Sequence, residues 1–222
     1  MDYYRITSIQ DSYFPKMHRL MQEVFPPEEV LEFSLWEEPI QDPGIHVYVA
    51  IANGEVVGAT EYRYYPHFRT AMTDFTIIGK PGLGIGRFLL KKREKDIERI
   101  ASESRTVPIG MFAEIYDPYR IEYSFGGVTP MNSYVRREVL SHIGYRKLDF
   151  SYVHPSWDHQ GDAVSGLDLS FLPAEEELGS LPAELVYNFL TEYYSALPNK
   201  PQAWNDMMDG LKTKNEIALL PL

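Results

Sequence analysis

Four glycines within eight residues, followed at once by an apolar run, form the first candidate site in this sequence. The stretch reads GKPGLGIGRFLL. A backbone binds a phosphate group well where several N–H groups converge at the start of a helix and glycines keep side chains away from the phosphate oxygens. The stretch therefore indicates a phosphate-binding loop with charged partners on either side. The residues that carry this prediction are Lys80, Gly82, Gly84, Gly86 and Arg87.

Two other phosphate-binding motifs fit this stretch less well. A dinucleotide-binding loop has the spacing G-x-G-x-x-G, whereas these glycines are spaced G-x-G-x-G. A P-loop ends in Gly-Lys followed by Ser or Thr, and the sequence contains no such run. A glycine-rich turn without any ligand stays open as the alternative.

The elements around the loop must position it, and they alternate between strands and helices. Before the loop, the pattern predicts a strand in YYRITSI, a helix in DSYFPKMHRLMQEVF and a β-hairpin at Asn53-Gly54. The run TAMTDFTIIG predicts a strand that leads directly into the glycines. The stretch RFLLKKREKDIERIASES then predicts a helix whose apolar face is interrupted by Arg93 and Glu94.

The second half of the chain continues in the same way. The run TVPIGMFAEIYDP predicts a buried strand, and NSYVRREVLSHIGY predicts a helix that ends at Gly144. Two more strands are predicted in RKLDFSYVHP and VSGLDLSFLP, and a last helix in LPAELVYNFLTEYYSALP. This order indicates the α+β class.

Composition limits the class of protein. The 222 residues include 32 acidic and 21 basic side chains, a net charge of −11, and no cysteine. An acidic surface disfavours nucleic acid as a partner and would attract a cationic substrate, although a solvated face that aids solubility is the alternative. Without cysteine or metal-binding histidine spacing, we expect no disulfide and no metal. We also expect no membrane span, no secretory signal and a cytoplasmic location.

The glycine loop, the hairpin before it and the later stretch SHIGYRKL together resemble the GCN5-related N-acetyltransferase (GNAT) family. The loop of that family reads Arg/Gln-x-x-Gly-x-Gly/Ala and holds the pyrophosphate of acetyl-CoA. Gly84 and Gly86 match its glycines, and GIGRFLL is similar to the family's GIG-x-x-LL. Pro81 stands where the family has Arg or Gln, and we expect Lys80 to substitute for it. The resemblance covers residues 4–173.

This resemblance implies a central mixed sheet, mostly antiparallel with one splayed parallel pair of strands, flanked by helices. Residues 1–173 would form the GNAT-like domain, and residues 174–222 a C-terminal helical extension packed on the same domain. The pantetheine arm of acetyl-CoA would lie between the strands TDFTIIG and IGMFAEIY, with backbone N–H groups of the first strand facing the thioester. The implied cofactor-binding residues are Phe75, Thr76, Ile77, Ile78, Lys80, Gly82, Leu83, Gly84, Ile85, Gly86 and Arg87.

Acetyl transfer to an amine needs a base, because a lysine-like amine is protonated in water. Glu114 lies in an otherwise apolar predicted strand, where partial burial would raise its pKa. We therefore expect Glu114 to be the base, directly or through water. A salt-bridged or edge-exposed carboxylate is the alternative reading of Glu114, and Asp74 and Glu61 are further candidates for the base.

The leaving thiolate gains from a proton donor. Many GNAT members use a tyrosine four residues before the glycine that ends the later helix, but Leu140 occupies that position here. Tyr134, earlier on the same predicted helix, is therefore the expected acid, and Tyr145 is the alternative.

These expectations combine into an N-acetyltransferase that moves an acetyl group from acetyl-CoA to a primary amine of a small molecule or protein, by direct attack through a tetrahedral intermediate. The alternative is a non-catalytic acyl-CoA-binding regulatory or interaction module with the same fold. The expected partners are acetyl-CoA and the acceptor amine, and a homodimer stays open.

Overall fold

The structure is a computed structural model that describes residues 1–25, 30–80, 82–120, 133–156 and 163–222. The chain forms two compact units. The first holds residues 1–111, and the second begins at Phe112 and includes the described residues from there to Leu222. Within the described ranges, no helix is long and apolar enough to cross a membrane.

Four strands form an antiparallel sheet in the first unit, in the order β1-β2-β3-β4. The turn between β2 and β3 confirms the predicted hairpin. Asn53 and Gly54 both have positive φ, 53° and 79°, as a two-residue type I′ turn requires. The strands are β1 (Asp2–Ile6), β2 (Ile45–Ala52), β3 (Glu55–Tyr65) and β4 (Thr70–Ile78).

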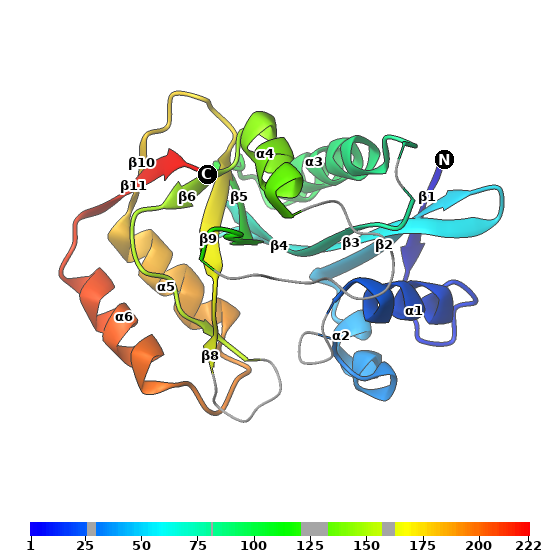
Figure 1. Cartoon of the computed structure of the whole chain (residues 1–222), viewed down its shortest axis with the longest axis horizontal. Coiled ribbons are helices and arrows are strands. Elements are labelled where there is room, and N and C mark those ends of the chain that lie inside the picture. The colour runs from blue at the N-terminus through cyan, green and yellow to red at the C-terminus, as the bar shows by residue number, and fades with distance from the viewer. Residues whose placement is uncertain (26–29, 81, 121–132, 157–162) are drawn as a thin grey trace. The chain divides into compact units, whose positions relative to one another are not determined.

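Helices cover both faces of this sheet (Figure 1). One face carries α1 (Phe14–Val24), the 3₁₀ turn η2 (Phe33–Trp36) and α2 (Glu37–Gln41), and the other carries α3 (Ile85–Glu103). Because side chains alternate along a strand, each strand supplies apolar residues to both layers. The α1 face buries Phe14, Met17, Trp36, Val47, Val49, Phe75 and Ile77. The α3 face buries Ala50, Val57, Ile85 and Leu89.

The strand β5 (Gly110–Tyr116) begins beside β4 and runs parallel to it. Its first residues, up to Met111, belong to the first unit. The Ile109 N–H donates to the Arg69 carbonyl at 2.8 Å, and the Thr73 hydroxyl contacts Met111 Sδ at 3.5 Å. Because residue numbers increase together along both segments, the two strands run in the same direction. The predicted parallel pairing of the strands TDFTIIG and IGMFAEIY is confirmed.

A β-bulge interrupts the pairing of β3 with β4. Glu61 pairs with Phe75, but the next residue, Tyr62, pairs with Thr73. Asp74 is therefore the extra residue on β4. Bulges bend a strand and redirect side chains, and this one lies directly before the residues that the resemblance assigns to the thioester.

The second unit contains a sheet of strands in the order β5-β9-β6-β11-β10. β6 pairs antiparallel with β9 on one side and with β11 on the other, and β10 pairs antiparallel with β11. A separate short pair joins β7 (His154–Pro155) to β8 (Ala163–Val164). The remaining strands are β6 (Arg146–Leu148), β9 (Leu167–Pro173), β10 (Ser180–Pro182) and β11 (Glu216–Pro221).

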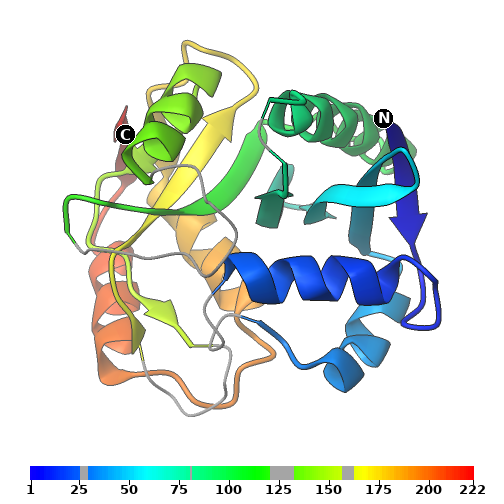
Figure 2. The same cartoon turned by 45° about the vertical axis from the view of Figure 1, so that its right-hand side comes forward.

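Helices α4 (Ser133–Ile143) and α5 (Ala183–Tyr193) cover opposite faces of this second sheet (Figure 2). On β9, Asp168 binds Arg137 of α4 at 2.8 Å, and Phe171 contacts Phe112, which stacks on Phe189 of α5 at 4.2 Å. The predicted helical extension contains α5 and α6 (Gln202–Lys212). It also supplies the strands β10 and β11, which the sequence pattern did not predict.

Candidate functional site

The glycine loop connects β4 to α3 in the first unit. Gly79 still pairs with the sheet through its N–H to the Val57 carbonyl at 2.9 Å. Gly82 and Gly84 then adopt left-handed backbone conformations, with φ of 83° and 67°. Residues with a Cβ adopt this region at a cost of about 1–2 kcal/mol, so the path of the loop favours glycine at both positions. A Cβ at Gly82 or Gly84 would meet no atom of the described part of the chain within 4 Å, so both positions have room for a ligand there.

The start of α3 presents unsatisfied N–H groups next to these glycines. Gly84 is the N-cap residue, no side chain of the described residues caps the helix, and its first turn contains no acidic residue. The first-turn N–H groups and the helix dipole therefore favour an anion. A close contact fixes this end of the helix: a Cβ at Gly58 of β3 would lie 2.5 Å from Ile85 Cγ2.

The side chains around the loop divide into two groups. Lys80, Leu83 and Arg87 are exposed, so both cations next to the loop are accessible to a ligand. Ile85 is buried against the sheet and Gly86 lies close to Ile78 Cδ1, so both hold the helix in place and offer only backbone atoms. Pro81 lies outside the described residues.

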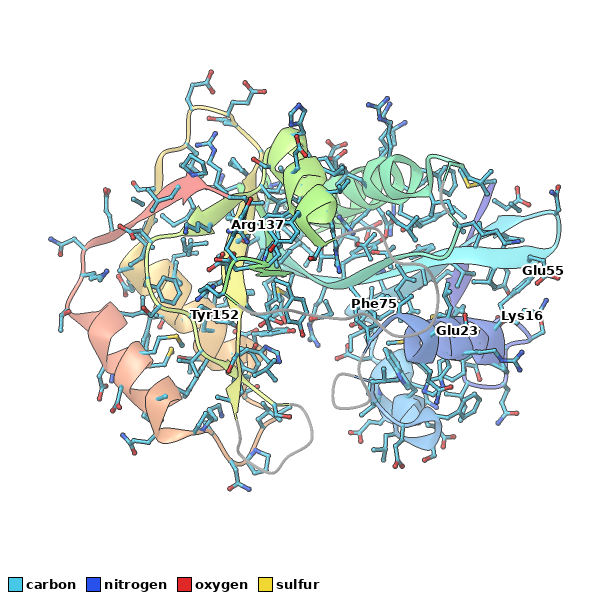
Figure 3. All side chains as sticks on the ribbon, viewed as in Figure 1. Lys16, Glu23, Glu55, Phe75, Arg137 and Tyr152 are labelled. Atoms are coloured by element: carbon cyan, nitrogen blue, oxygen red, sulfur yellow. The ribbon has the colours of Figure 1, made fainter. Side chains whose placement is uncertain are left out.

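The four assigned residues of β4 point alternately to the two faces of the sheet. Phe75, labelled in Figure 3, lies on the side of the sheet that carries α1. Ile77 is buried on the same face, and the ring centroids of Phe75 and Trp36 are 6.4 Å apart. Thr76 points to the α3 face, where its hydroxyl accepts a hydrogen bond from Arg93 at 2.7 Å. The exposed fraction of Ile78 is 38%. Phe75 and Ile77 can therefore serve a ligand only through their backbone.

Two carboxyl groups meet at the bulge of β4. Glu61 of β3 is buried and is hydrogen-bonded to the exposed Asp74. Burial and the neighbouring Asp74 carboxyl raise the pKa of Glu61 well above its usual value, and Arg63 opposes this effect. A carboxyl pair of this kind titrates as a unit and holds one proton to a higher pH than an isolated glutamate would.

This pair predicts a pH-dependent stability. The unfolded chain releases the Glu61 proton near the ordinary pKa of 4.5, whereas the folded chain keeps it to a higher pH. The folded state therefore binds more protons in that window, and the free energy of unfolding falls as the pH rises through it. We expect Glu61→Gln to flatten the profile of the thermal midpoint above about pH 4.5. Glu103→Gln, at an exposed site, is the control, and an unchanged profile in Glu61→Gln would contradict the assignment.

In the second unit, Glu114 of β5 is the centre of a buried polar cluster. Its Oε1 accepts hydrogen bonds from the hydroxyls of Tyr152 and Tyr194 and lies 2.8 Å from His154 Nδ1. The hydroxyls of Tyr152 and Tyr194 are 2.7 Å apart, and that of Tyr194 lies 2.8 Å from His154 Nδ1. Tyr152 is labelled in Figure 3.

The charge state of Glu114 follows from this cluster. Burial opposes ionisation, but His154 and the hydrogen bonds from His154, Tyr152 and Tyr194 outweigh it and lower the pKa of Glu114. Burial, together with the Glu114 charge, raises the pKa of Tyr194 well above its usual value, so this phenol stays a donor. The expected rise of the Glu114 pKa is wrong, because sequence reasoning counted burial and missed the three donors.

Tyr134 lies on α4 and is 47% exposed. Its ring meets Tyr119 edge-on, with centroids 5.0 Å apart. Tyr134 is not among the described hydrogen-bond partners of Glu114, so the structure does not bring the two expected catalytic residues into direct contact. In the described part of the chain, no group of three or more histidine or acidic side chains is arranged to hold a metal ion.

Comparison with solved structures identifies the fold. A protein from Bacteroides thetaiotaomicron assigned to the GNAT family of acetyltransferases matches with a TM-score of 0.60 and 16% identity, over 89% of this chain and 97% of that one. The PaiA N-acetyltransferase of Thermoplasma acidophilum, solved with coenzyme A, matches with a TM-score of 0.53 and 11% identity, over 78% and 99% of the two chains. The chain has the GNAT fold.

A third GNAT-family structure, from Desulfovibrio desulfuricans, matches with a TM-score of 0.50 and 18% identity, over 79% of this chain and 98% of that one. No family model and no curated relative matches the sequence. The recognition of the GNAT fold from the glycine loop and the order of elements is therefore confirmed at the level of three-dimensional structure.

The residues of the GNAT-type loop fit the pyrophosphate of coenzyme A. The fit rests on the uncapped start of α3, the room for a ligand at Gly82 and Gly84, and the exposed Lys80 and Arg87. Sequence reasoning missed His154, Tyr152 and Tyr194, which have no diagnostic spacing, and Arg93, which appeared only as an interruption of an apolar face.

Proposed function

We propose that this chain is an N-acetyltransferase that transfers the acetyl group of acetyl-CoA to a primary amine of a small molecule or protein. The observation that carries the proposal is the glycine loop, with its two left-handed glycines at the uncapped start of α3. Three-dimensional similarity to GNAT acetyltransferases, one of them solved with coenzyme A, supports it.

We assign the binding of acetyl-CoA to β4, the loop and the first turn of α3. Backbone N–H groups of the loop and of α3 bind the pyrophosphate, and Lys80 and Arg87 add positive charge. Backbone N–H groups of β4 face the thioester, beside the start of the parallel strand β5. The assigned residues are Phe75, Thr76, Ile77, Ile78, Lys80, Gly82, Leu83, Gly84, Ile85, Gly86 and Arg87.

Acetyl-CoA, when bound, supplies an activated acetyl thioester. The acceptor nitrogen forms a bond to the acetyl carbon, the carbon–sulfur bond breaks, and the amine proton passes to a base. We propose the Glu61–Asp74 pair as that base. It lies at the bulge next to the assigned β4 amides, and its raised pKa suits proton transfer near neutral pH better than the lowered pKa of Glu114.

We also propose roles for Tyr134 and Glu114 and a division of the chain into a domain and an extension. Tyr134 is the proposed acid for the thiolate, and Glu114 is the second candidate for the base. We propose residues 1–173 as the acetyltransferase domain and residues 174–222 as an extension packed on it. The stacking of Phe112 on Phe189, and the pairing of β6 with β11, support the packing of the extension.

Calorimetric titration with acetyl-CoA and with coenzyme A, followed by a screen of amines that measures released thiol, tests the function. We expect binding and amine-dependent release of coenzyme A. Binding without turnover on any amine would favour a non-catalytic acyl-CoA-binding module, and no binding would contradict the proposal.

The base is tested by Asp74→Asn and Glu61→Gln on the best amine of that screen. We expect each variant to lower kcat by about a hundredfold or more, with the Kd for acetyl-CoA unchanged, because acid–base catalysis contributes 10²- to 10⁴-fold. Glu114→Gln tests the second candidate for the base, and Tyr134→Phe tests the proposed acid. Full activity in Asp74→Asn together with loss in Glu114→Gln would return the role of base to Glu114.

A further inference from the structure

Arg93 of α3 is a buried guanidinium whose described hydrogen bonds go to two neutral hydroxyl groups. The side chain is 3% exposed. Its Nη1 donates to Thr60 Oγ1 at 2.9 Å and to Thr76 Oγ1 at 2.7 Å, and no carboxylate in the described ranges forms an ion pair with it. Its Nε is buried without a described partner. Burying a charge without a counter-ion is costly, so a specific role for Arg93 is indicated.

The Thr60 hydroxyl, which accepts from Arg93, in turn donates a hydrogen bond to the backbone of β4. Thr60 Oγ1 donates to the Phe75 carbonyl at 3.0 Å. An arginine can only donate, so the hydrogen bond from Arg93 occupies a lone pair of Thr60 and leaves its single hydroxyl proton to donate. The Phe75 carbonyl at 3.0 Å is the nearer acceptor, and Thr76 Oγ1 lies farther away at 3.4 Å. The result is a fixed sequence of hydrogen bonds from Arg93 through Thr60 to the Phe75 carbonyl. All three residues belong to the first unit.

The direction of the Phe75–Thr76 peptide group decides which backbone N–H these hydrogen bonds affect. Phe75 accepts from Thr60, a residue of β3, so its carbonyl points toward β3. In a trans peptide group the N–H points the opposite way, so the Thr76 N–H points to the side of β4 on which β5 begins. A hydrogen bond to the carbonyl polarises the whole peptide group and strengthens its N–H as a donor.

We propose that Arg93 and Thr60 polarise the Phe75–Thr76 peptide group, so that the Thr76 N–H binds the thioester oxygen of acetyl-CoA more strongly than an ordinary strand amide would. The inference rests on the proposed function and deepens it. Arg93 and Thr60 are positioning residues, since they act through the β4 backbone. The charge of Arg93 is thereby directed toward an oxygen that becomes more negative during transfer.

The polarisation itself can be measured without any ligand. Phe-Thr occurs once in the sequence, at residues 75–76, so labelling phenylalanine carbonyls with ¹³C and threonine nitrogens with ¹⁵N gives a single carbonyl–amide NMR cross peak. We expect Thr60→Val to shift the resonances of the Phe75 carbonyl carbon and the Thr76 amide proton upfield. Thr60→Ser keeps the hydroxyl, so we expect both resonances to stay near their wild-type positions. Arg93→Met should move them in the same direction by less. Arg99→Met, at an exposed site on the same helix, should leave them unchanged.

The effect on the substrate is measured with acetyl-CoA labelled with ¹³C at the thioester carbonyl. We expect binding to the wild type to move this carbon downfield. Thr60→Val should reduce the movement, while the Kd stays within about threefold of the wild-type value. This readout needs no acceptor amine, and Thr60→Val carries the test if Arg93→Met does not fold.

The outcomes separate the inference from the function on which it rests. An unchanged Phe75–Thr76 cross peak in Thr60→Val overturns the proposed polarisation. A shifted cross peak with an unchanged thioester signal overturns its role in binding the thioester oxygen. Failure of the wild type to bind acetyl-CoA overturns the proposed function, and the catalytic part of the inference with it, even where the cross peak moves as expected.

Discussion

Replacing Gly84 with aspartate is expected to weaken acetyl-CoA binding by about a hundredfold or more. The new carboxylate lies at the N-cap of α3, where it would occupy the N–H groups that we assign to the pyrophosphate and repel its charge. A hundredfold loss corresponds to about 2.8 kcal/mol, within the range for two unit charges about 4 Å apart near a protein surface. Calorimetric titration with acetyl-CoA measures the loss.

Gly84→Asn is the matched variant, because asparagine has nearly the same shape, tolerates left-handed φ and carries no charge. We expect its loss of affinity to be clearly smaller. Gly54→Asp, at the positive-φ turn between β2 and β3, introduces the same charge outside the assigned loop and should leave binding almost unchanged. Equal binding by Gly84→Asp and the wild type would show that the loop is a turn without a ligand.

Glu114→Ala is expected to lower the free energy of unfolding by about 3 kcal/mol. The substitution removes the carboxylate that accepts from Tyr152 and Tyr194 and lies 2.8 Å from His154 Nδ1, and it leaves these buried polar groups without their common partner. In a chain of this length, that loss corresponds to a thermal midpoint about 6–12 °C lower. Thermal unfolding followed by circular dichroism measures it.

The cluster around Glu114 also predicts that the stability of the fold decreases at acidic pH. The pKa of Glu114 is lowered on folding, so its contribution is present above the ordinary pKa of 4.5 and is lost as the pH falls through the folded value. Glu114→Gln should remove this contribution, and Glu103→Ala, at an exposed site, should change the midpoint little. A midpoint in Glu114→Ala equal to that of the wild type would contradict the structural role.

The features that could be predicted from the sequence depend on short-range chemistry. Asn53-Gly54 predicts its turn because both residues accept positive φ, and the glycines before α3 predict the loop for the same reason. Glu114 stood out because a carboxylate in an apolar strand needs partners. Those partners are 38 to 80 residues away in the sequence, on segments without any pattern that links them to β5, so their identity required the fold.

The bulge at Asp74 and the role of Arg93 could not be predicted from the sequence, for a different reason. A bulge is a property of two strands in register, and in the sequence of β4 alone Asp74 is only one of several polar residues. Arg93 interrupts the apolar face of its helix, and an exposed arginine at a helix edge gives the same pattern. Its burial against Thr60 and Thr76 decides between the two.

The pairing of β11 with β6 has a consequence for protein design. β6 has three residues and lies between β9 and β11, so a chain truncated at residue 173 would leave one side of it unpaired. The same truncation removes α5, whose Phe189 stacks on Phe112 of β5, and so uncovers an aromatic surface. Exposed strand edges and apolar faces promote aggregation. We therefore expect the extension to be needed for folding of the second unit, and a chain truncated at residue 173 to aggregate on expression.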